Sequence, residues 1–145
     1  MIGLIQRVTS ANVIVDEKII GQIDQGILVL VGVQREDNKA KANRLLERLL
    51  SYRIFSDEDD KMNLSLQDIN GGLFLVPQFT LAADTKKGTR PGFSNAAAPD
   101  QAKQLFSYIV EQANETYSNV QQGQFGADMK VSLVNDGPVT FWLEV

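Results

Sequence analysis

The first third of the chain alternates short apolar runs with turn-forming residues, a pattern typical of an antiparallel meander of β-strands. The predicted strands cover residues 2–8, 12–15, 18–23 and 27–33, with a turn at Asp16-Glu17. The run 27–33 is far shorter than the roughly 20 apolar residues that span a bilayer. Its β-branched content favours a buried strand instead.

Two later segments carry apolar residues at the spacing of amphipathic helices. Asp37 or Asn38 can cap the start of the first helix, and Pro99-Asp100 opens the second. The two apolar faces consist of Ala42, Leu45, Leu46, Leu49 and Leu50 in the first helix, and of Ala102, Leu105, Phe106, Ile109, Val110 and Ala113 in the second.

The rest of the chain is predicted to contain further strands and one long loop. The strands cover residues 52–55, 73–81, 120–125, 129–134 and 139–145, and Pro77 places the second of them at a sheet edge or a bulge. Residues 82–98 lack a sustained period, so we expect a functional loop. These elements predict a single α+β domain with a curved or barrel-like, mainly antiparallel sheet packed by two main helices.

The acidic segment at residues 56–61 is predicted to be an exposed loop. A calcium loop is the alternative, but counting from Asp57 puts Met62 where the EF-hand turn needs glycine. The same count puts Asp68 where a bidentate glutamate is preferred. The sequence therefore predicts neither a metal site nor a cofactor.

The chain of 145 residues contains no histidine and no cysteine. Ser-His-Asp and Cys-His catalysis are thereby excluded, as are zinc sites built from thiolate and imidazole. Any catalysis must use hydroxyls, carboxylates, backbone groups or the substrate. Without cysteine there is no disulfide framework, and no basic segment leads into a long apolar stretch, so we expect a cytoplasmic protein.

A net charge of −4 argues against a protein that coats nucleic acid by bulk electrostatics. A local basic patch is still possible at residues 86–90, where Lys86, Lys87 and Arg90 flank a glycine and can meet phosphates. A solvated surface loop explains the same charges equally well.

Two segments combine polar groups with unusual backbone chemistry beside an apolar strand. They are Pro77-Gln78-Phe79-Thr80-Leu81 and Asn135-Asp136-Gly137-Pro138-Val139-Thr140. Taken alone, the first is explained by a strand edge with a buried aromatic residue. The second is explained by a hairpin turn, because Asn, Asp, Gly and Pro are common turn formers.

Taken together, these segments closely resemble the paired motifs of the D-aminoacyl-tRNA deacylase family. The resemblance covers essentially the whole chain. It includes Ile5-Gln6-Arg7-Val8, Tyr52-Arg53-Ile54-Phe55-Ser56-Asp57, Ala83-Asp84-Thr85-Lys86-Lys87-Gly88, Phe93-Ser94-Asn95-Ala96 and Val131-Ser132-Leu133-Val134. It implies a homodimeric tRNA editing enzyme, with active sites at the subunit interface, that cuts the ester between a D-amino acid or glycine and the terminal adenosine.

The resemblance also implies a chiral filter: Gly137-Pro138, in the cis form, is placed in the active site of the partner subunit. D-amino acids share no side chain that a pocket can recognise, whereas every L-amino acid except glycine projects its side chain in one direction. Specificity by clash needs only rigid bulk in that direction. Acceptance of glycine follows, since it has no side chain to clash.

Gln78, Phe79 and Thr80 match the family motif that lines the pocket for the adenosine and the aminoacyl group. Thr80 has two candidate roles. As a nucleophile it lacks a histidine to take its proton. We favour the alternative, in which backbone amides around Phe79 and Thr80 stabilise the oxyanion and the ribose 2′-hydroxyl helps to activate water.

Pro77 stands where the family motif usually begins with serine, so a role of that serine cannot be carried over to this chain. Phe125 and Met129 resemble residues near the family's pocket, although an apolar residue on a strand is more often core. Asp84 and Asp136 are explained by turn or cap hydrogen bonds rather than by acid-base chemistry.

Two other classes of function are compatible with the sequence. A non-catalytic module for the acceptor end of RNA would stack a base on Phe79 or Phe93 and would protect the ester rather than cleave it. A purely structural dimerisation protein would have no affinity for charged tRNA.

Overall fold

The computed structural model describes residues 1–145. Its strands are β1 (Ile2–Val15), β2 (Lys18–Ile23), β3 (Gly26–Gly32), β4 (Phe55–Ser56), β5 (Met62–Leu64), β6 (Gly72–Pro77), β7 (Val120–Gln122) and β8 (Lys130–Glu144). Its helices are α1 (Lys39–Ser51), α2 (Leu66–Ile69), the 3-10 helix η1 (Phe79–Ala82) and α3 (Pro99–Thr116). Two main helices pack on a curved sheet, so the predicted α+β class is confirmed.

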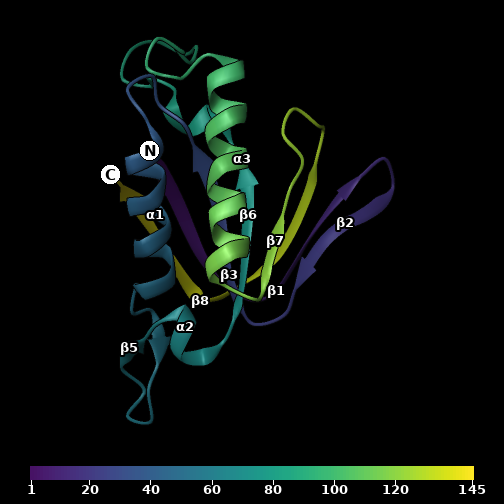
Figure 1. The fold of residues 1–145 in the computed structure, drawn as a ribbon, viewed down its shortest axis with the longest axis vertical. Coiled ribbons are helices and arrows are strands. Elements are labelled where there is room, and N and C mark those ends of the chain that lie inside the picture. Colours follow the sequence, from purple (N-terminus) through teal and green to yellow (C-terminus); the bar gives the residue numbers. More distant parts are fainter.

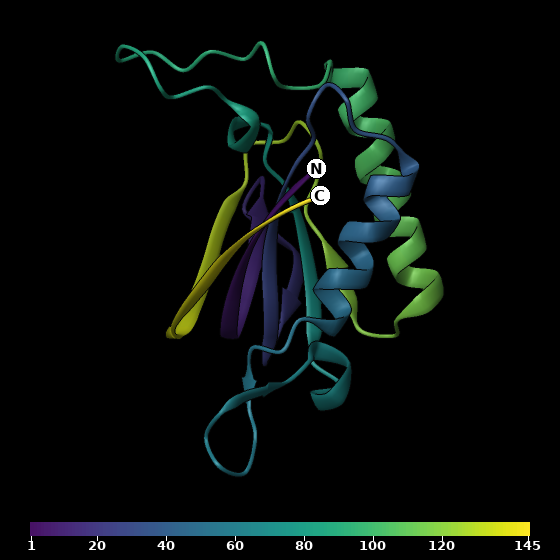
Figure 2. The same ribbon diagram turned by 90° about the vertical axis from the view of Figure 1, so that its left-hand side faces the viewer.

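Six strands form one strongly curved sheet in the order β2-β1-β3-β6-β7, with β8 also paired to β1. The sheet is mixed, because β3, β6 and β7 run parallel while β2, β3 and β8 pair antiparallel with β1. Helix α1 connects β3 to β6 and α3 connects β6 to β7, as crossovers between parallel strands require. Both helices therefore cover the same face of the sheet (Figures 1 and 2).

Two pairs of predicted strands are each one long strand. β1 includes both 2–8 and 12–15, and β8 includes most of 129–134 and 139–145. β8 pairs with β1 on both sides of residues 136–139, which bulge out of the ladder instead of reversing the chain. The hairpin interpretation of Asn135 to Thr140 is therefore wrong, because long-range pairing with β1 continues beyond the turn-forming residues.

Other predicted strands have different limits. The strand at 73–81 ends at Pro77, which has no N–H to donate, and the chain continues into η1. β7 ends at Gln122, and the strand predicted at 52–55 is the short Phe55–Ser56. No periodicity predicts the single turn of α2, which a capping box between Ser65 and Asp68 holds.

The helix starts agree with the sequence. Asn38 caps α1 by accepting the Lys41 N–H at 3.0 Å, while the neighbouring Asp37 is buried and accepts from the Met1 ammonium at 2.6 Å. Pro99 occupies the first turn of α3. None of the helices is both long and apolar enough to cross a membrane.

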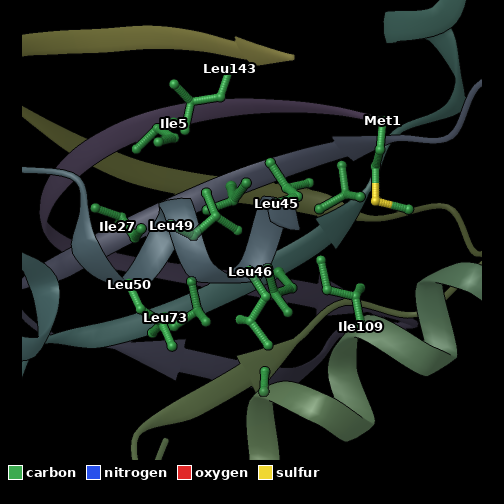
Figure 3. Packing of buried hydrophobic residues seen from close by; sticks show 14 of the residues in the cluster. Met1, Ile5, Ile27, Leu45, Leu46, Leu49, Leu50, Leu73, Ile109 and Leu143 are labelled. Carbon is green, nitrogen blue, oxygen red and sulfur yellow. The ribbon is translucent and has the colours of Figure 1, made fainter. Parts of the chain in front are cut away.

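Two apolar clusters support the sheet from its two faces. The larger one joins the apolar faces of α1 and α3 to sheet residues such as Ile5, Ile27 and Leu73 (Figure 3). The smaller one, around Val8 and Phe74, fills the inside of the curved sheet. Full burial of each such side chain contributes about 1.5–3 kcal/mol. The strands are therefore a firm support for the segments that follow them.

Candidate functional site

The segment Gln78 to Leu81 leaves the carboxyl end of β6 and lies on the surface as η1. Its backbone is attached to the sheet at one point, where the Gln78 N–H donates to the Val31 carbonyl at 2.8 Å. The helix begins with the Leu81 N–H donating to the Gln78 carbonyl, so the N–H groups of Phe79 and Thr80 have no acceptor within the helix. Donors of this kind can bind a negatively charged oxygen.

Phe79 and Thr80 at the start of η1 are exposed, whereas Leu81 is half-buried and Ala82 is buried. The Phe79 side chain is 59% exposed, and its ring lies 5.4 Å from that of Phe93, centroid to centroid, with the ring planes tilted by 40°. The Gln78 amide donates to Thr80 Oγ1, which orients the hydroxyl of this exposed threonine. Loop 82–98 thus brings an aromatic residue back to η1.

An apolar cavity of about 210 Å³ lies beside η1. Its walls are Pro77, Phe79, Ala97, Pro99, Ala102, Phe125 and Gly126. The structure therefore brings Phe125 to Phe79. It does not bring Met129 to this cavity, because Met129 packs against the inner cluster of the sheet and its sulfur accepts the Gln124 N–H at 3.3 Å.

The long loop between η1 and α3 projects beyond the end of the sheet (Figure 2). A pair of backbone hydrogen bonds between Asp84 and Gly92, at 2.7 and 2.9 Å, closes its base. Asp84 also caps the loop through the Lys86 N–H at 3.0 Å, as expected for a turn residue. Lys86, Lys87 and Arg90 are all exposed in this loop.

The second motif forms the bulge of β8, defined here as residues 136–139. The Gly137-Pro138 peptide bond is cis, and both residues are exposed. Gly137 has φ +135°, and a Cβ added there would lie 2.7 Å from Val139 Cγ2. From β1, Arg7 Nε donates to the Asp136 carbonyl at 3.0 Å and Arg7 Nη1 donates to the Ile54 carbonyl at 2.7 Å.

The two motifs lie at opposite ends of the sheet. The bulge begins after Asn135, which pairs with Val8, and Val8 pairs in turn with Gly26 at the start of β3. η1 follows Pro77, which pairs with Val31 near the end of β3. Five residues of β3 separate these levels, which is about 16 Å at the usual strand rise. Figure 2 shows the sharp bend of β8 low in the view and η1 high.

Sequence reasoning missed the residues that hold the bulge. Arg7 belongs to the N-terminal motif, but only its place opposite residues 136–139 shows that it contacts them. Asn135 and Thr140 stand at the ends of the second motif, and their side chains hydrogen-bond to each other at 2.8 Å. The sequence does not indicate that contact, because an Asn at this position fits a turn as well as it fits a bulge.

Comparison with known proteins identifies full-length relatives. The family model described as D-Tyr-tRNA(Tyr) deacylase matches residues 4–144. D-aminoacyl-tRNA deacylases from Photorhabdus laumondii and Citrobacter koseri are 59% and 60% identical over 145 residues, covering 100% of both chains. A solved structure titled c-Myc DNA Unwinding Element Binding Protein is 37% identical, with a TM-score of 0.95 over 100% of this chain and 99% of its own. A probable eukaryotic D-amino acid tRNA deacylase, 17% identical, shares the fold with a TM-score of 0.81.

Proposed function

Because this chain belongs to the D-Tyr-tRNA(Tyr) deacylase family, and is therefore a hydrolase, we propose that it cleaves D-aminoacyl-tRNA in the cytoplasm. Its products are the free D-amino acid and the tRNA, and glycyl-tRNA is a second substrate. The observation that carries this proposal is the apolar cavity beside η1, whose first N–H groups have no acceptor within the helix, in a chain 59% identical to D-aminoacyl-tRNA deacylases over its full length. A non-catalytic RNA module is disfavoured by the same family membership.

The cavity beside η1 is suited to the terminal adenosine of the tRNA. It is apolar, and Phe79 and Phe125 line it. Unstacked bases are commonly recognised by stacking on aromatic side chains. With the base held there, the aminoacyl ester lies near the free N–H groups of Phe79 and Thr80.

The chemistry is hydrolysis of an activated ester. Water attacks the carbonyl carbon, and the N–H groups of Phe79 and Thr80 stabilise the oxyanion that forms. The ester C–O bond then breaks, its electron pair and a proton go to the ribose 3′-oxygen, and the amino acid leaves as the acid. The neighbouring 2′-hydroxyl helps to activate the water. Thr80 positions the substrate, because no histidine is present to make its hydroxyl a strong nucleophile.

The chiral filter is Gly137-Pro138 of a second copy of the chain. This pair is exposed, yet it lies at the far end of the sheet from η1 of its own chain. In a homodimer, each bulge can enter the partner's site, so that Gly137-Pro138 of one copy lies beside η1 of the other. Held backbone atoms there exclude an L side chain and leave glycine unaffected.

The test is hydrolysis of matched D- and L-aminoacyl-tRNA by purified protein. We expect turnover of the D ester and of glycyl-tRNA, and rejection of the L ester. Thr80→Ala is expected to retain a substantial part of the activity, whereas tRNA ending in 2′-deoxyadenosine is expected to lose most of it. Near-complete loss with Thr80→Ala alone would overturn this mechanism, and protection of the D ester would overturn the enzymatic function.

Lys86, Lys87 and Arg90 are proposed to contact tRNA phosphates. They are exposed on a loop that projects beside the site, and none forms an ion pair within 4.0 Å. Each phosphate contact steepens the salt dependence of binding. Replacing all three by Gln is expected to raise KM and flatten its salt dependence, with kcat little changed.

A further inference from the structure

One side chain fastens the base of the β8 bulge. Asn135 Oδ1 accepts the Val139 N–H at 2.8 Å, and Asn135 Nδ2 donates to Thr140 Oγ1 at 2.8 Å. Asn135 is the last residue paired with β1 before the bulge, and Thr140 is the first one paired after it. The asparagine amide therefore closes the gap across which the ladder with β1 is interrupted.

The exposed tip of the bulge lies between this closure and a contact on its other side. There Arg7 donates to the Asp136 carbonyl. Gly137 and Pro138 are exposed between the two fastened points, while Val139 is 7% exposed and anchors the chain in the core. The tip thus projects into solvent on a base that cannot shift without breaking hydrogen bonds.

Asparagine suits this position because its amide accepts and donates within one plane. Its oxygen satisfies a part-buried backbone N–H, and its nitrogen reaches a hydroxyl that can accept. An unpaired buried N–H carries a substantial desolvation cost. Loss of the amide would therefore favour movement of Val139 towards solvent, and the tip would move with it.

We propose that Asn135 is a positioning residue that sets the chiral selectivity of the enzyme by holding Gly137-Pro138 in place. The inference rests on the proposed function of that pair as a filter. Rejection by clash requires that the clashing atoms cannot retreat. Asn135 does not touch the substrate, and it acts on selectivity only through the position of the tip.

The experiment compares Asn135→Ala with the wild type in hydrolysis of matched D- and L-aminoacyl-tRNA. We expect cleavage of the L ester to rise relative to the D ester, so that the D/L ratio of kcat/KM falls about tenfold or more, equivalent to about 1.4 kcal/mol per decade. Asn135→Asp keeps the acceptor for the Val139 N–H and is expected to restore most of the ratio. Ser132→Ala, on an exposed position of the same strand, is the matched control and should leave the ratio unchanged.

Thr140→Val provides a second variant that removes only the 2.8 Å bond between the two side chains. It is expected to lower the D/L ratio by less than Asn135→Ala, and Thr140→Ser is expected to restore it. If Asn135→Ala fails to fold, the D/L ratio of kcat/KM of Thr140→Val tests the role of Asn135. If kcat/KM falls by the same factor for the D ester and the L ester in the folded variants, the D/L ratio is unchanged. That result would mean that Asn135 has only a structural role.

Failure of this inference differs from failure of the proposed filter. A wild-type protein that cleaves D and L esters alike would overturn the filter itself. A selective wild type whose ratio falls in Gly137→Ala but not in Asn135→Ala or Thr140→Val would retain the filter and overturn the role of Asn135.

Discussion

The β8 bulge interrupts the pairing of one strand and η1 follows the end of another strand of the same sheet, and the two segments are held in different ways. The chain is paired with β1 on both sides of the bulge. Within the bulge, the Asp136 carbonyl accepts from Arg7 and the Val139 N–H donates to Asn135, whose amide also donates to Thr140. η1 is attached at its start through Gln78 and leads into a projecting loop. The comparison indicates a division of labour: the segment proposed to exclude substrates is held firmly, and the segment proposed to bind them is open.

The largest difference between the two regions is expected from Arg7→Met. This change removes a cationic donor from the Asp136 and Ile54 carbonyls, and hydrogen bonds to charged groups contribute about 1.5–3 kcal/mol each. Destabilisation of about 3 kcal/mol is therefore expected in urea unfolding. Gln78→Ala, at the residue that precedes η1, is the matched change and should cost less than about 1 kcal/mol. Equal losses in the free energy of unfolding would contradict the conclusion that the bulge is held more firmly than η1.

A smaller effect is expected from Gly137→Ala. The new Cβ would meet Val139 Cγ2 at 2.7 Å, at a φ of +135° that side chains rarely adopt. Such strain costs on the order of 1–3 kcal/mol. Gly88→Ala is the control in the open loop: its φ is +70°, but nothing lies within 4 Å of an added Cβ, so about 1 kcal/mol is expected. Thermal unfolding of both variants measures the difference.

Phe79→Ala should separate activity from stability. The side chain is 59% exposed, so its removal is expected to change the free energy of unfolding by about 0.5 kcal/mol or less. If its ring stacks the terminal base, kcat/KM for D-aminoacyl-tRNA should fall about tenfold, because base stacking contributes about 1–3 kcal/mol. Activity that stays at the wild-type level would remove Phe79 from the binding site.

The smallest expected effect is a loss of stability in acid, and it comes from Asp68 in α2, outside both the β8 bulge and η1. Hydrogen bonds from the Ser65 backbone N–H and hydroxyl hold the pKa of Asp68 below its ordinary value. Its contribution to stability is therefore present above its unfolded pKa, about 3.9, and is lost as the pH falls through the lower folded value. Urea midpoints of wild type and Asp68→Asn should differ at pH 7 and converge near pH 2. A constant difference would exclude this linkage.

Much of the fold could be predicted because its signals are local. The periodicity of α1 and α3 and their starts at Asn38 and Pro99 depend on neighbouring residues. The end of β6 at Pro77 was not predicted, because the apolar run continues to Leu81. The parallel order of β3, β6 and β7 and the continuity of β8 could not be predicted, because they depend on pairing between residues far apart in the chain. Gly, Pro and Asn indicate turns and bulges alike.

The candidate site shows the same limit. Resemblance to a family identified Gln78, Phe79, Thr80, Gly137 and Pro138, and those roles stay predictions. Their placement at opposite ends of one sheet is visible only in the structure. The contacts of Asn135 follow from a bulge whose existence depends on the distant strand β1.

The way β8 is paired with β1 also decides how the enzyme would fail on warming. Weakly attached segments open at lower free energy than strands fixed in the core. With the proposed roles, η1 and its loop would lose the substrate while the bulge still stood in place. Heat would then stop cleavage before it allowed cleavage of correctly charged L-aminoacyl-tRNA, so that translation would be deprived of an editor without gaining an indiscriminate hydrolase.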